Sequence, residues 1–284
     1  SRGLGDVYKR QVAHRVEDDT WTAIQCKFYL ETTTIQKSNL DSFFEASGRS
    51  FETENGTENF ANRLIISTTD RWSSNAEAAL ENQIIPTNRI GLASIAESPI
   101  DWDVAFPGSE MQIHLTKRET FEPRPHQQAA IENAIKGFET HERGQLIMAC
   151  GTGKTFTGLR LAERVANNNG GRARVLFLVP SISLLSQTLK EWTAQAQLDL
   201  RSYAVCSDNK VSKKAEDIAS YDLEVPVSTE GKSIAERFSR GKRFKGLHVV
   251  FSTYQSLPAV HDAQQEGLED FDLVICDEAH RTTG

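Results

Sequence analysis

LIMACGTGKT, residues 146–155, decides the fold of this chain, because an apolar run passes directly into a glycine-rich turn and then into a helical pattern. Gly151 and Gly153 let backbone N–H groups face phosphate oxygens, and the N-terminus of the following helix favours an anion. In such a loop Lys154 would reach the β- and γ-phosphates of a nucleotide, and the Thr155 hydroxyl would ligate Mg²⁺. The loop residues expected to contact the nucleotide are Gly151, Thr152, Gly153, Lys154 and Thr155.

A second motif, FDLVICDEAH at residues 271–280, is an apolar strand pattern that ends in two adjacent carboxylates. Asp277 suits coordination of Mg²⁺, and Glu278 suits activation of a water molecule. An accidental surface turn is the alternative for the glycine-rich loop alone, and a solvated acidic turn is the alternative for this strand. The order of the motifs favours one shared site for ATP and Mg²⁺, in which Lys154 and Glu278 are the catalytic residues.

Apolar strand patterns and helical patterns alternate around these motifs. Helices are expected at His126–Glu139, Lys154–Asn167 and Leu184–Gln197, and strands at Gly144–Ala149, Arg174–Val179, His248–Ser252 and Leu273–Cys276. Strands that are apolar along their whole length and separated by helices are typical of a parallel sheet covered on both faces. The second part of the chain is therefore predicted to be an α/β domain.

The residues before Pro99 predict a smaller α/β unit. Its expected strands are Val12–Arg15, Trp21–Tyr29, Arg63–Ser67 and Ile90–Ser94, and its expected helices are Lys37–Ser47 and Ser74–Glu81. An irregular, proline-containing stretch follows, and we place the domain boundary near residue 115, giving domains 12–114 and 115–284. Residues 1–11, SRGLGDVYKRQ, resemble translated adapter text and are set aside. A genuine flexible N-terminus is the alternative.

The composition is that of an ordinary globular protein, since 38% of the 284 residues are hydrophobic and 25% are charged. The net charge of −7 argues against electrostatic binding of nucleic acid by the surface as a whole, although a local groove can still bind phosphates. The sequence has no long apolar run and no secretory signal, so we expect no membrane partner and a cytoplasmic location. No zinc or disulfide pattern is formed by Cys26, Cys150, Cys206 and Cys276.

Four blocks, ACGTGKT, VLFLVPSISLLSQTLKEW, VVFSTYQSL and VICDEAH, follow one another between residues 121 and 284. In this order they resemble the first RecA-like domain of superfamily 2 helicases and translocases of the DEAH-box type, especially the motor subunits of restriction enzymes. Met148 stands where the general pattern GxxxxGK[ST] has glycine, so the match is to the helicase form of the loop. The resemblance implies a RecA-like P-loop NTPase domain, with Arg124–Gln127 as the adenine-reading segment and a bidentate contact of Gln127 with adenine.

The resemblance also implies that two polar segments touch the sugar-phosphate backbone of double-stranded DNA, through Ser181, Ser183, Thr253 and Gln255. Hydroxyls and amides at strand ends can donate to phosphates without reading the base sequence. They can equally be helix caps and turn formers, and the residues alone leave this choice open. A basic run with aromatic residues would suit a nucleic-acid path, although a solvated face is the favoured alternative. This run comprises Arg237, Arg240, Lys242, Arg243 and Lys245, with Phe238 and Phe244.

In the front unit, the strand pattern TWTAIQCKFY at residues 20–29 contains Gln25 and Lys27. Alternation along a strand places both side chains on one face, where an oxygen ligand of a metal ion and a cation can converge on one phosphate. The pattern resembles the Mrr-like branch of the PD-(D/E)XK nucleases, which implies catalytic roles for both residues. That family also has an aspartate on the preceding strand, at the position of Arg10, so we expect the main Mg²⁺ ligand and DNA cleavage to be absent. A domain with an incidental QCK is the alternative.

Together the resemblances predict the front part of a prokaryotic restriction enzyme, similar to type ISP or related type I and III systems. Both ends of the sequence are interpreted as cut, so a second RecA-like domain and methyltransferase or specificity domains are expected outside it. Hydrolysis in such motors uses an arginine from the second domain, so these residues alone should bind ATP with little turnover. The alternatives are a nucleic-acid-binding module with ATP as a conformational switch, and a DNA-repair or RNA-processing DEAH helicase.

Overall fold

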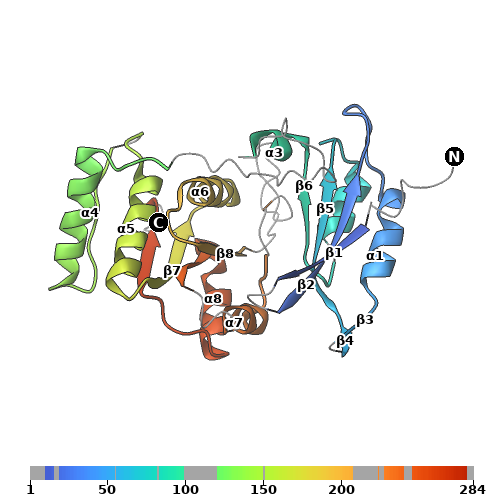
Figure 1. The fold of residues 1–284 in the computed structure, drawn as a ribbon. Helices are drawn as coiled ribbons and strands as arrows, with labels where there is room; N and C mark the ends of the chain where they lie inside the picture. Colours follow the sequence, from blue (N-terminus) through green and yellow to red (C-terminus); the bar gives the residue numbers. More distant parts are fainter. Residues whose placement is uncertain are drawn as a thin grey trace, which may run out of the picture.

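The computed structural model describes residues 10–15, 19–54, 56–81, 83–98, 120–149, 151–206, 223, 227–239 and 245–279. Figure 1 shows two α/β units side by side, each built around its own sheet. The expected α/β class, a small front unit followed by a domain with a parallel sheet, is confirmed. The predicted boundary near residue 115 lies outside the described residues.

The front unit is built on a four-stranded sheet of order β1-β2-β5-β6. Its strands are β1 (Arg10–Arg15), β2 (Thr20–Lys27), β5 (Phe60–Ser67) and β6 (Thr87–Ile90). Strand β1 runs antiparallel to β2, and the other neighbours are parallel. Because β1 begins at Arg10, the last residues of the segment set aside as adapter text, Arg10 and Gln11, belong to the sheet. Excluding them from the fold was wrong.

One face of this sheet carries the core of the front unit. Helices α1 (Asp41–Ser47) and α2 (Ser74–Glu81) cover it, and a short hairpin of β3 (Phe51–Thr53) and β4 (Gly56–Glu58) follows α1. Both helices bring apolar side chains onto the sheet, which stabilises the unit because that surface leaves water. The buried cluster comprises Ala23, Ile35, Leu40, Phe43, Ile65, Ala76 and Leu80.

The expected strand at Ile90–Ser94 is wrong. The strand there is β6, which ends at Ile90, and helix α3 (Leu92–Glu97) follows it. The carboxylate of Asp70 accepts a hydrogen bond from the backbone N–H of Ala93 at 3.1 Å, in the first turn of this helix. The contact satisfies one of the N–H groups that a helix start leaves open, so a tertiary partner overrides the local strand pattern.

The second unit contains a fully parallel sheet of order β10-β7-β9-β8. Its strands are β7 (Arg172–Val179), β8 (Leu200–Val205), β9 (Gly246–Thr253) and β10 (Leu273–Cys276). Every residue of β9 is buried, as expected for a central strand with both faces covered. Strand β8 was not anticipated from the sequence.

Helices cover both faces of this sheet. Helices α5 (Lys154–Asn168) and α6 (Ile182–Gln195) pack on one face, and α7 (Gly231–Ser239) and α8 (Leu257–Gln265) pack on the other. Helix α4 (Pro125–Phe138) lies outside α5 at the edge of the unit (Figure 1). The predicted α4, α5 and α6 are confirmed within a few residues, whereas α7 and α8 were not predicted.

The expected strand at Gly144–Ala149 is absent, because residues 144–149 form no regular element. A strand needs a partner for its backbone groups, and among the described residues none pairs with this segment. Ile147 is 85% exposed in consequence. Strand β10, which directly precedes the acidic motif, is an edge strand in the described sheet, and Val274 on it is 51% exposed.

The two units also contact each other through polar groups. The buried Asn88 on β6 donates from Nδ2 to the backbone carbonyl of Leu223 at 2.7 Å, and Leu223 belongs to the core of the second unit. Lys190 on α6 lies 3.6 Å from the carboxylate of Glu97 on α3. The open face of the front sheet therefore points toward the second unit.

Candidate functional site

The glycine-rich loop has the backbone conformation that its sequence predicts. Gly151 and Gly153 have positive φ angles of 75° and 80°, a region that disfavours residues with a Cβ atom. A Cβ atom at Gly153 would also come within 2.5 Å of Nε2 of Gln127. Helix α5 begins at Lys154, directly after this bend. The N–H groups of the first helical turn therefore open onto the loop, as a phosphate site requires.

The acidic motif meets this loop through one ion pair. Nζ of Lys154 lies 2.7 Å from Oε1 of Glu278, and the two side chains are 32% and 24% exposed. The residues are 124 positions apart in sequence, so the contact depends on the fold of the domain. The predicted catalytic pair is thus brought together at the junction of α5 and the end of β10.

Asp277 and Glu278 sit on a tightly constrained turn. The N–H of Asp277 donates to the carbonyl of Leu178 at 2.9 Å, which extends the β10–β7 pairing by one residue. Glu278 has a φ of 53°, which is uncommon for a residue other than glycine, and its N–H donates to Oδ1 of Asp277 at 3.0 Å. The strained turn places the two adjacent carboxylates on the loop side of the sheet edge.

The electrostatic environment of Asp277 favours a cation. Burial raises the pKa of this carboxyl above its ordinary 3.8, while the nearby Lys154 ammonium and the Glu278 N–H lower it in part. A partly desolvated carboxylate gains more from a metal ion than a solvated one, because charges interact more strongly where water is excluded. The carboxylate of Asp277 is therefore suited to the role of a magnesium ligand.

Thr155, the second predicted magnesium ligand, is held in the first turn of α5 by a buried tryptophan. Nε1 of Trp192 on α6 donates to the Thr155 carbonyl at 3.1 Å. The Trp192 ring is fully buried and packs edge-on against Phe177 and Phe251 of the sheet. This contact fixes the loop end of α5 on the core, and sequence reasoning did not anticipate it.

Gln127, the predicted adenine-reading residue, is buried next to the loop. Its Nε2 donates to the carbonyl of Thr152 at 2.9 Å, and its Oε1 accepts from the N–H of Arg124 at 2.8 Å. The imidazole of His126 lies 3.4 Å from the same Thr152 carbonyl. The amide therefore braces the loop through both its oxygen and its nitrogen.

The residues present fit a nucleotide with Mg²⁺. The loop offers backbone N–H groups and a helix start for phosphates, Lys154 offers a cation, and an added Cβ at Gly151 would meet open space. The Thr155 hydroxyl and the Asp277 carboxylate are oxygen donors, the kind that Mg²⁺ prefers. This fit rests on the geometry of the loop and the chemistry of the donors together.

The predicted DNA-contact residues differ in accessibility. Oγ of Ser181 accepts from the N–H of Leu184 at 3.3 Å and caps α6, and Ser183 is half-buried in the first turn of that helix. Thr253 is 3% exposed, and its hydroxyl lies 3.0 Å from that of Ser256. Gln255, by contrast, is exposed. Capping and turn-forming roles are therefore observed for Ser181 and Thr253, and Gln255 is the most accessible of the set.

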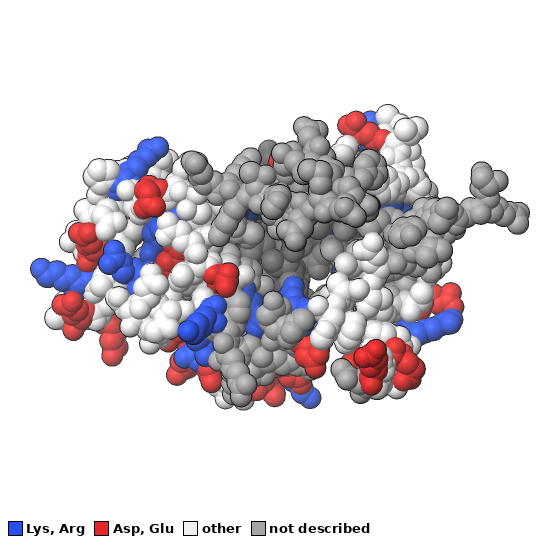
Figure 2. Space-filling model, in the orientation of Figure 1, with Lys and Arg blue, Asp and Glu red and all other residues white. Residues whose placement is uncertain are grey.

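The basic run gives a mixed result. Phe238 is 6% exposed in the core cluster beneath α7, so its ring packs against the sheet rather than lining a surface path. Lys245 is exposed. The residues 240–244 and the side chain of Arg237 lie outside the described part of the chain. On the face shown in Figure 2, acidic and basic side chains are interspersed over the described parts of both units.

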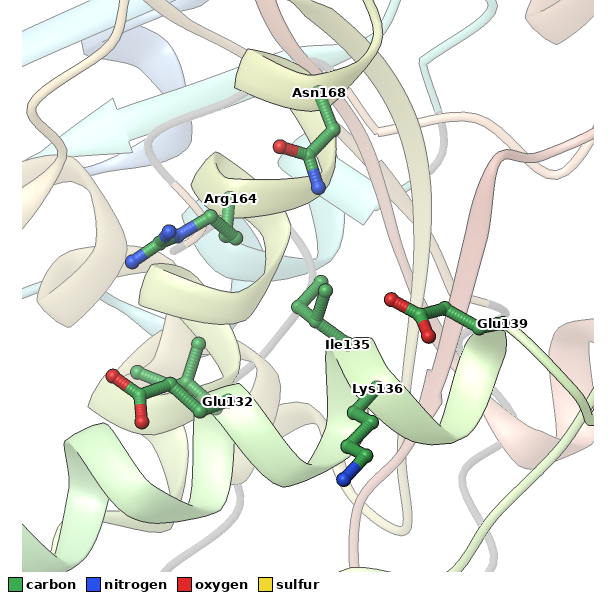
Figure 3. Close-up of a pocket in the computed structure, with 7 residues that line it drawn as sticks. Glu132, Ile135, Lys136, Glu139, Arg164 and Asn168 are labelled. Carbon is green, nitrogen blue, oxygen red and sulfur yellow. The ribbon is translucent and has the colours of Figure 1, made fainter.

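A shallow groove of about 300 Å³ lies between α4 and α5 (Figure 3). It is lined by Ile131, Glu132, Ile135, Lys136, Glu139, Arg164 and Asn168. Arg164 is ten residues beyond Lys154 on α5, or about 15 Å along the helix at its usual rise. The groove therefore lies toward the C-terminal end of α5, where the helix dipole disfavours phosphates. It mixes charges of both signs and contains none of the predicted site residues.

The predicted nuclease residues lie together in the front sheet. Gln25 pairs with Ile65 and Lys27 with Ser67 on β5, so both side chains point to the helix-covered face. Gln25 is 3% exposed, and its Oε1 has no hydrogen-bond partner among the described residues. Arg10 lies directly opposite Gln25 on β1. One amide oxygen beside an arginine position is a poor magnesium site, so the residues present do not fit a catalytic metal there.

The remaining expectations concern the cysteines, metal clusters and membrane-spanning helices. Among the described residues, Cys26, Cys206 and Cys276 form no disulfide bond, and Cys150 lies outside these residues. Within the described ranges, three or more His, Cys, Asp or Glu side chains never gather as a metal cluster would require. No helix in the same ranges combines the length and apolarity needed to cross a bilayer.

Comparison with known proteins matches both units. The family model described as "Type III restriction enzyme, res subunit" matches residues 120–284, and the one described as "Restriction endonuclease" matches residues 11–112. Among solved structures, the chain is similar to the "ATP-dependent Type ISP restriction-modification enzyme LlaBIII bound to DNA", with 38% sequence identity and a TM-score of 0.81. That match covers 96% of this chain and 17% of the other.

Two further relatives match shorter parts. A nuclease-deletion mutant of the type ISP restriction-modification enzyme LlaGI, in complex with a DNA substrate mimic, is 43% identical over 56% of this chain and 15% of that chain, with a TM-score of 0.49. A probable helicase of African swine fever virus is 31% identical over 170 residues, or 59% of this chain and 17% of that protein. The chain thus spans about a sixth of the length of the relatives it matches.

Proposed function

Because the chain belongs to the family described as type III restriction enzyme, res subunit, we propose that its second unit binds ATP with Mg²⁺ and double-stranded DNA as the first RecA-like domain of a restriction-enzyme motor. The motor resemblance, the nuclease resemblance and the fold class expected from the sequence are all confirmed by the matches to both family models and to the type ISP structure. The ATP dependence and the bound DNA named for LlaBIII support the same assignment.

One observation supports the nucleotide site most strongly. Lys154 and Glu278 come from distant motifs, yet their side chains meet at 2.7 Å beside a glycine bend whose positive φ angles disfavour residues with a Cβ atom. A structural ion pair alone would not require the bend, the helix start and the adjacent Asp277. The combination is that of a P-loop site.

Each residue of the proposed site would have a distinct role. The loop N–H groups and Lys154 would bind and orient the β- and γ-phosphates, which places the nucleotide for attack. Glu278 would accept a proton from the attacking water. Bound Mg²⁺, held by Thr155 and Asp277, would supply neutralisation of phosphate charge. Trp192 positions Thr155 by donating a hydrogen bond from its indole N–H to the backbone carbonyl of Thr155.

The 284 residues alone are proposed to bind ATP with little turnover. The resemblance to RecA-like motors implies that an arginine from a second domain stabilises charge on the transferring phosphoryl group. Robust DNA-stimulated hydrolysis by this chain in isolation would overturn that part of the proposal.

The test of the nucleotide site is Lys154→Ala. We expect it to abolish binding of a fluorescent ATP analogue with Mg²⁺ while the circular dichroism spectrum is unchanged, because the lysine supplies the cation that faces the phosphates. Lys190→Ala, which removes an exposed lysine from α6, is the matched control and should keep the affinity of the parent chain. Equal affinity of the parent chain and Lys154→Ala would refute the assignment.

We propose that the front unit is a restriction-endonuclease domain without cleavage activity of its own. Arg10 lies opposite Gln25, where the resemblance implies the aspartate that holds Mg²⁺. A cation at that position repels a metal ion. Arg10→Asp should therefore create Mg²⁺-dependent nicking of plasmid DNA, whereas Arg10→Ala should not. Cleavage by the parent chain would contradict the proposal, and so would an Arg10→Asp variant as inactive as Arg10→Ala.

A further inference from the structure

Tyr254 lies between two predicted DNA contacts, Thr253 at the end of the central strand and Gln255 in the turn that follows. Strand β9 ends at Thr253, and a single 3₁₀ turn, η4 (Tyr254–Ser256), leads into α8. The hydroxyls of Thr253 and Ser256, 3.0 Å apart, close this turn. Three consecutive residues, one buried, one half-buried and one exposed, are therefore held as one rigid corner. A displacement of Gln255 on binding DNA would therefore also move its chain neighbour Tyr254.

The Tyr254 side chain reaches the acidic motif. Its hydroxyl donates to the backbone carbonyl of Asp277 at 2.7 Å, across 23 positions of sequence. The ring packs beside the core cluster that joins α7 and α8 to the sheet. Burial of the ring, the Cys276 thiol and the neighbouring carboxylates raise the pKa of the hydroxyl well above its ordinary range. The tyrosine hydroxyl thus holds the backbone of the acidic motif through a hydrogen bond.

The accepting carbonyl belongs to the peptide bond that joins the two acidic residues. The N–H of the same peptide donates to Oδ1 of Asp277, and Glu278 follows in the left-handed conformation. Because a peptide unit is planar, tilting its carbonyl also tilts its N–H. A displaced Tyr254 would thus shift the Asp277 carboxylate and the Glu278 side chain, which contacts Lys154.

We propose that Tyr254 is a positioning residue that couples DNA binding at residues 253–256 to nucleotide binding at the Asp277–Glu278 peptide. The inference rests on the proposed function, since it needs both ligands. The expected DNA ligand is a duplex, bound through its sugar-phosphate backbone by polar groups around Gln255. Two sites linked through one contact must influence each other equally, so DNA should change nucleotide affinity by the factor by which nucleotide changes DNA affinity.

The test measures this factor in the whole 284-residue chain. Affinity for a fluorescent ATP analogue with Mg²⁺ is titrated with and without a saturating duplex oligonucleotide, for the parent chain, Tyr254→Phe and Tyr203→Phe. We expect DNA to shift the nucleotide affinity of the parent chain by about fivefold or more, a typical coupling. Tyr254→Phe should still bind each ligand alone but show a shift near onefold. Tyr203→Phe, which removes a hydroxyl from β8 in the same sheet, should keep the parental shift.

Each other outcome separates the two proposals. If the parent chain binds neither ligand, the proposed function fails and the coupling falls with it. If it binds both ligands but their affinities are independent, or if Tyr254→Phe keeps the parental shift, the coupling role is refuted and the proposed function stands. A Tyr254→Phe chain that melts several degrees lower and loses nucleotide affinity without DNA would assign the hydroxyl a structural role and also refute the coupling.

Discussion

Replacing Glu278 by glutamine should make this chain bind ATP more tightly. Lys154 donates to Glu278 at 2.7 Å, so the lysine must leave that carboxylate before it can reach a phosphate. Glutamine keeps the size of the side chain and an acceptor oxygen but removes the charge. The substitution therefore lowers the cost of freeing Lys154, and it also removes a negative charge near the site of the γ-phosphate.

The magnitude follows from the exposure of the pair. A hydrogen bond between charged groups contributes about 1.5–3 kcal/mol when it is shielded from water. Here the two side chains are 32% and 24% exposed, which reduces the contribution to about 1 kcal/mol by analogy with solvent-screened pairs. A gain of about 1 kcal/mol corresponds to a roughly fivefold lower Kd.

The assay is isothermal titration of the chain with a non-hydrolysable ATP analogue and Mg²⁺, at an ionic strength of about 0.15 M because salt screens the pair. Glu266→Gln removes the same charge from the exposed end of α8 and should leave the Kd unchanged. Unchanged or weaker binding by Glu278→Gln would refute the idea that the carboxylate and the phosphates compete for Lys154.

Three further substitutions test the core packing and the buried charges of the second unit. Trp192→Phe should cost about 2 kcal/mol of unfolding free energy in urea and weaken Mg²⁺-nucleotide binding, because the indole fills the core and holds the loop; equal stability would contradict this. Arg160→Ala should cost about 3–5 kcal/mol by removing the cation that neutralises the buried Glu163, while Arg164→Ala on the same helix should cost little. Burial raises the pKa of Glu191 above 4.5, so the folded state holds that proton more tightly and stability falls as pH rises through the raised value. Glu191→Gln should therefore melt higher than the parent at pH 7, with the gap closing toward pH 4, and a gap of equal size at both pH values would exclude this assignment.

Much of the second unit was predictable because its signals are local. An apolar run before adjacent carboxylates identifies β10, and a glycine bend before an amphipathic pattern identifies the start of α5. The meeting of Lys154 and Glu278 agrees with the shared site expected from the motif order, although only the acidic motif follows a strand of the described sheet.

The errors arise where a long-range partner decides the local structure. Residues 144–149 have the apolar pattern of a strand, yet no described strand pairs with them. A strand was expected at Ile90–Ser94, but residues 92–97 form a helix whose first turn is bonded to Asp70. Single-sequence patterns cannot contain such contacts.

Tyr254 shows the same limit within the site. The motif drew attention to its hydroxyl and amide neighbours, because those groups suit phosphates. The contact of the tyrosine with Asp277 spans 23 positions and involves a backbone carbonyl, which no side-chain pattern encodes. The resemblance gave Arg10 the position of the family's aspartate, but the expected strand began at Val12, so the register that sets Arg10 opposite Gln25 was not predicted.

A crystal structure of the chain with Mg²⁺ and a non-hydrolysable ATP analogue is the most direct measurement of the site. We expect the analogue at the N-terminus of α5, with its β-phosphate inside the bend of Gly151 and Gly153 and its γ-phosphate between Lys154 and Glu278. An analogue bound elsewhere, with the Lys154–Glu278 pair intact and the bend empty, would contradict the assignment of this chain as an ATP-driven motor domain.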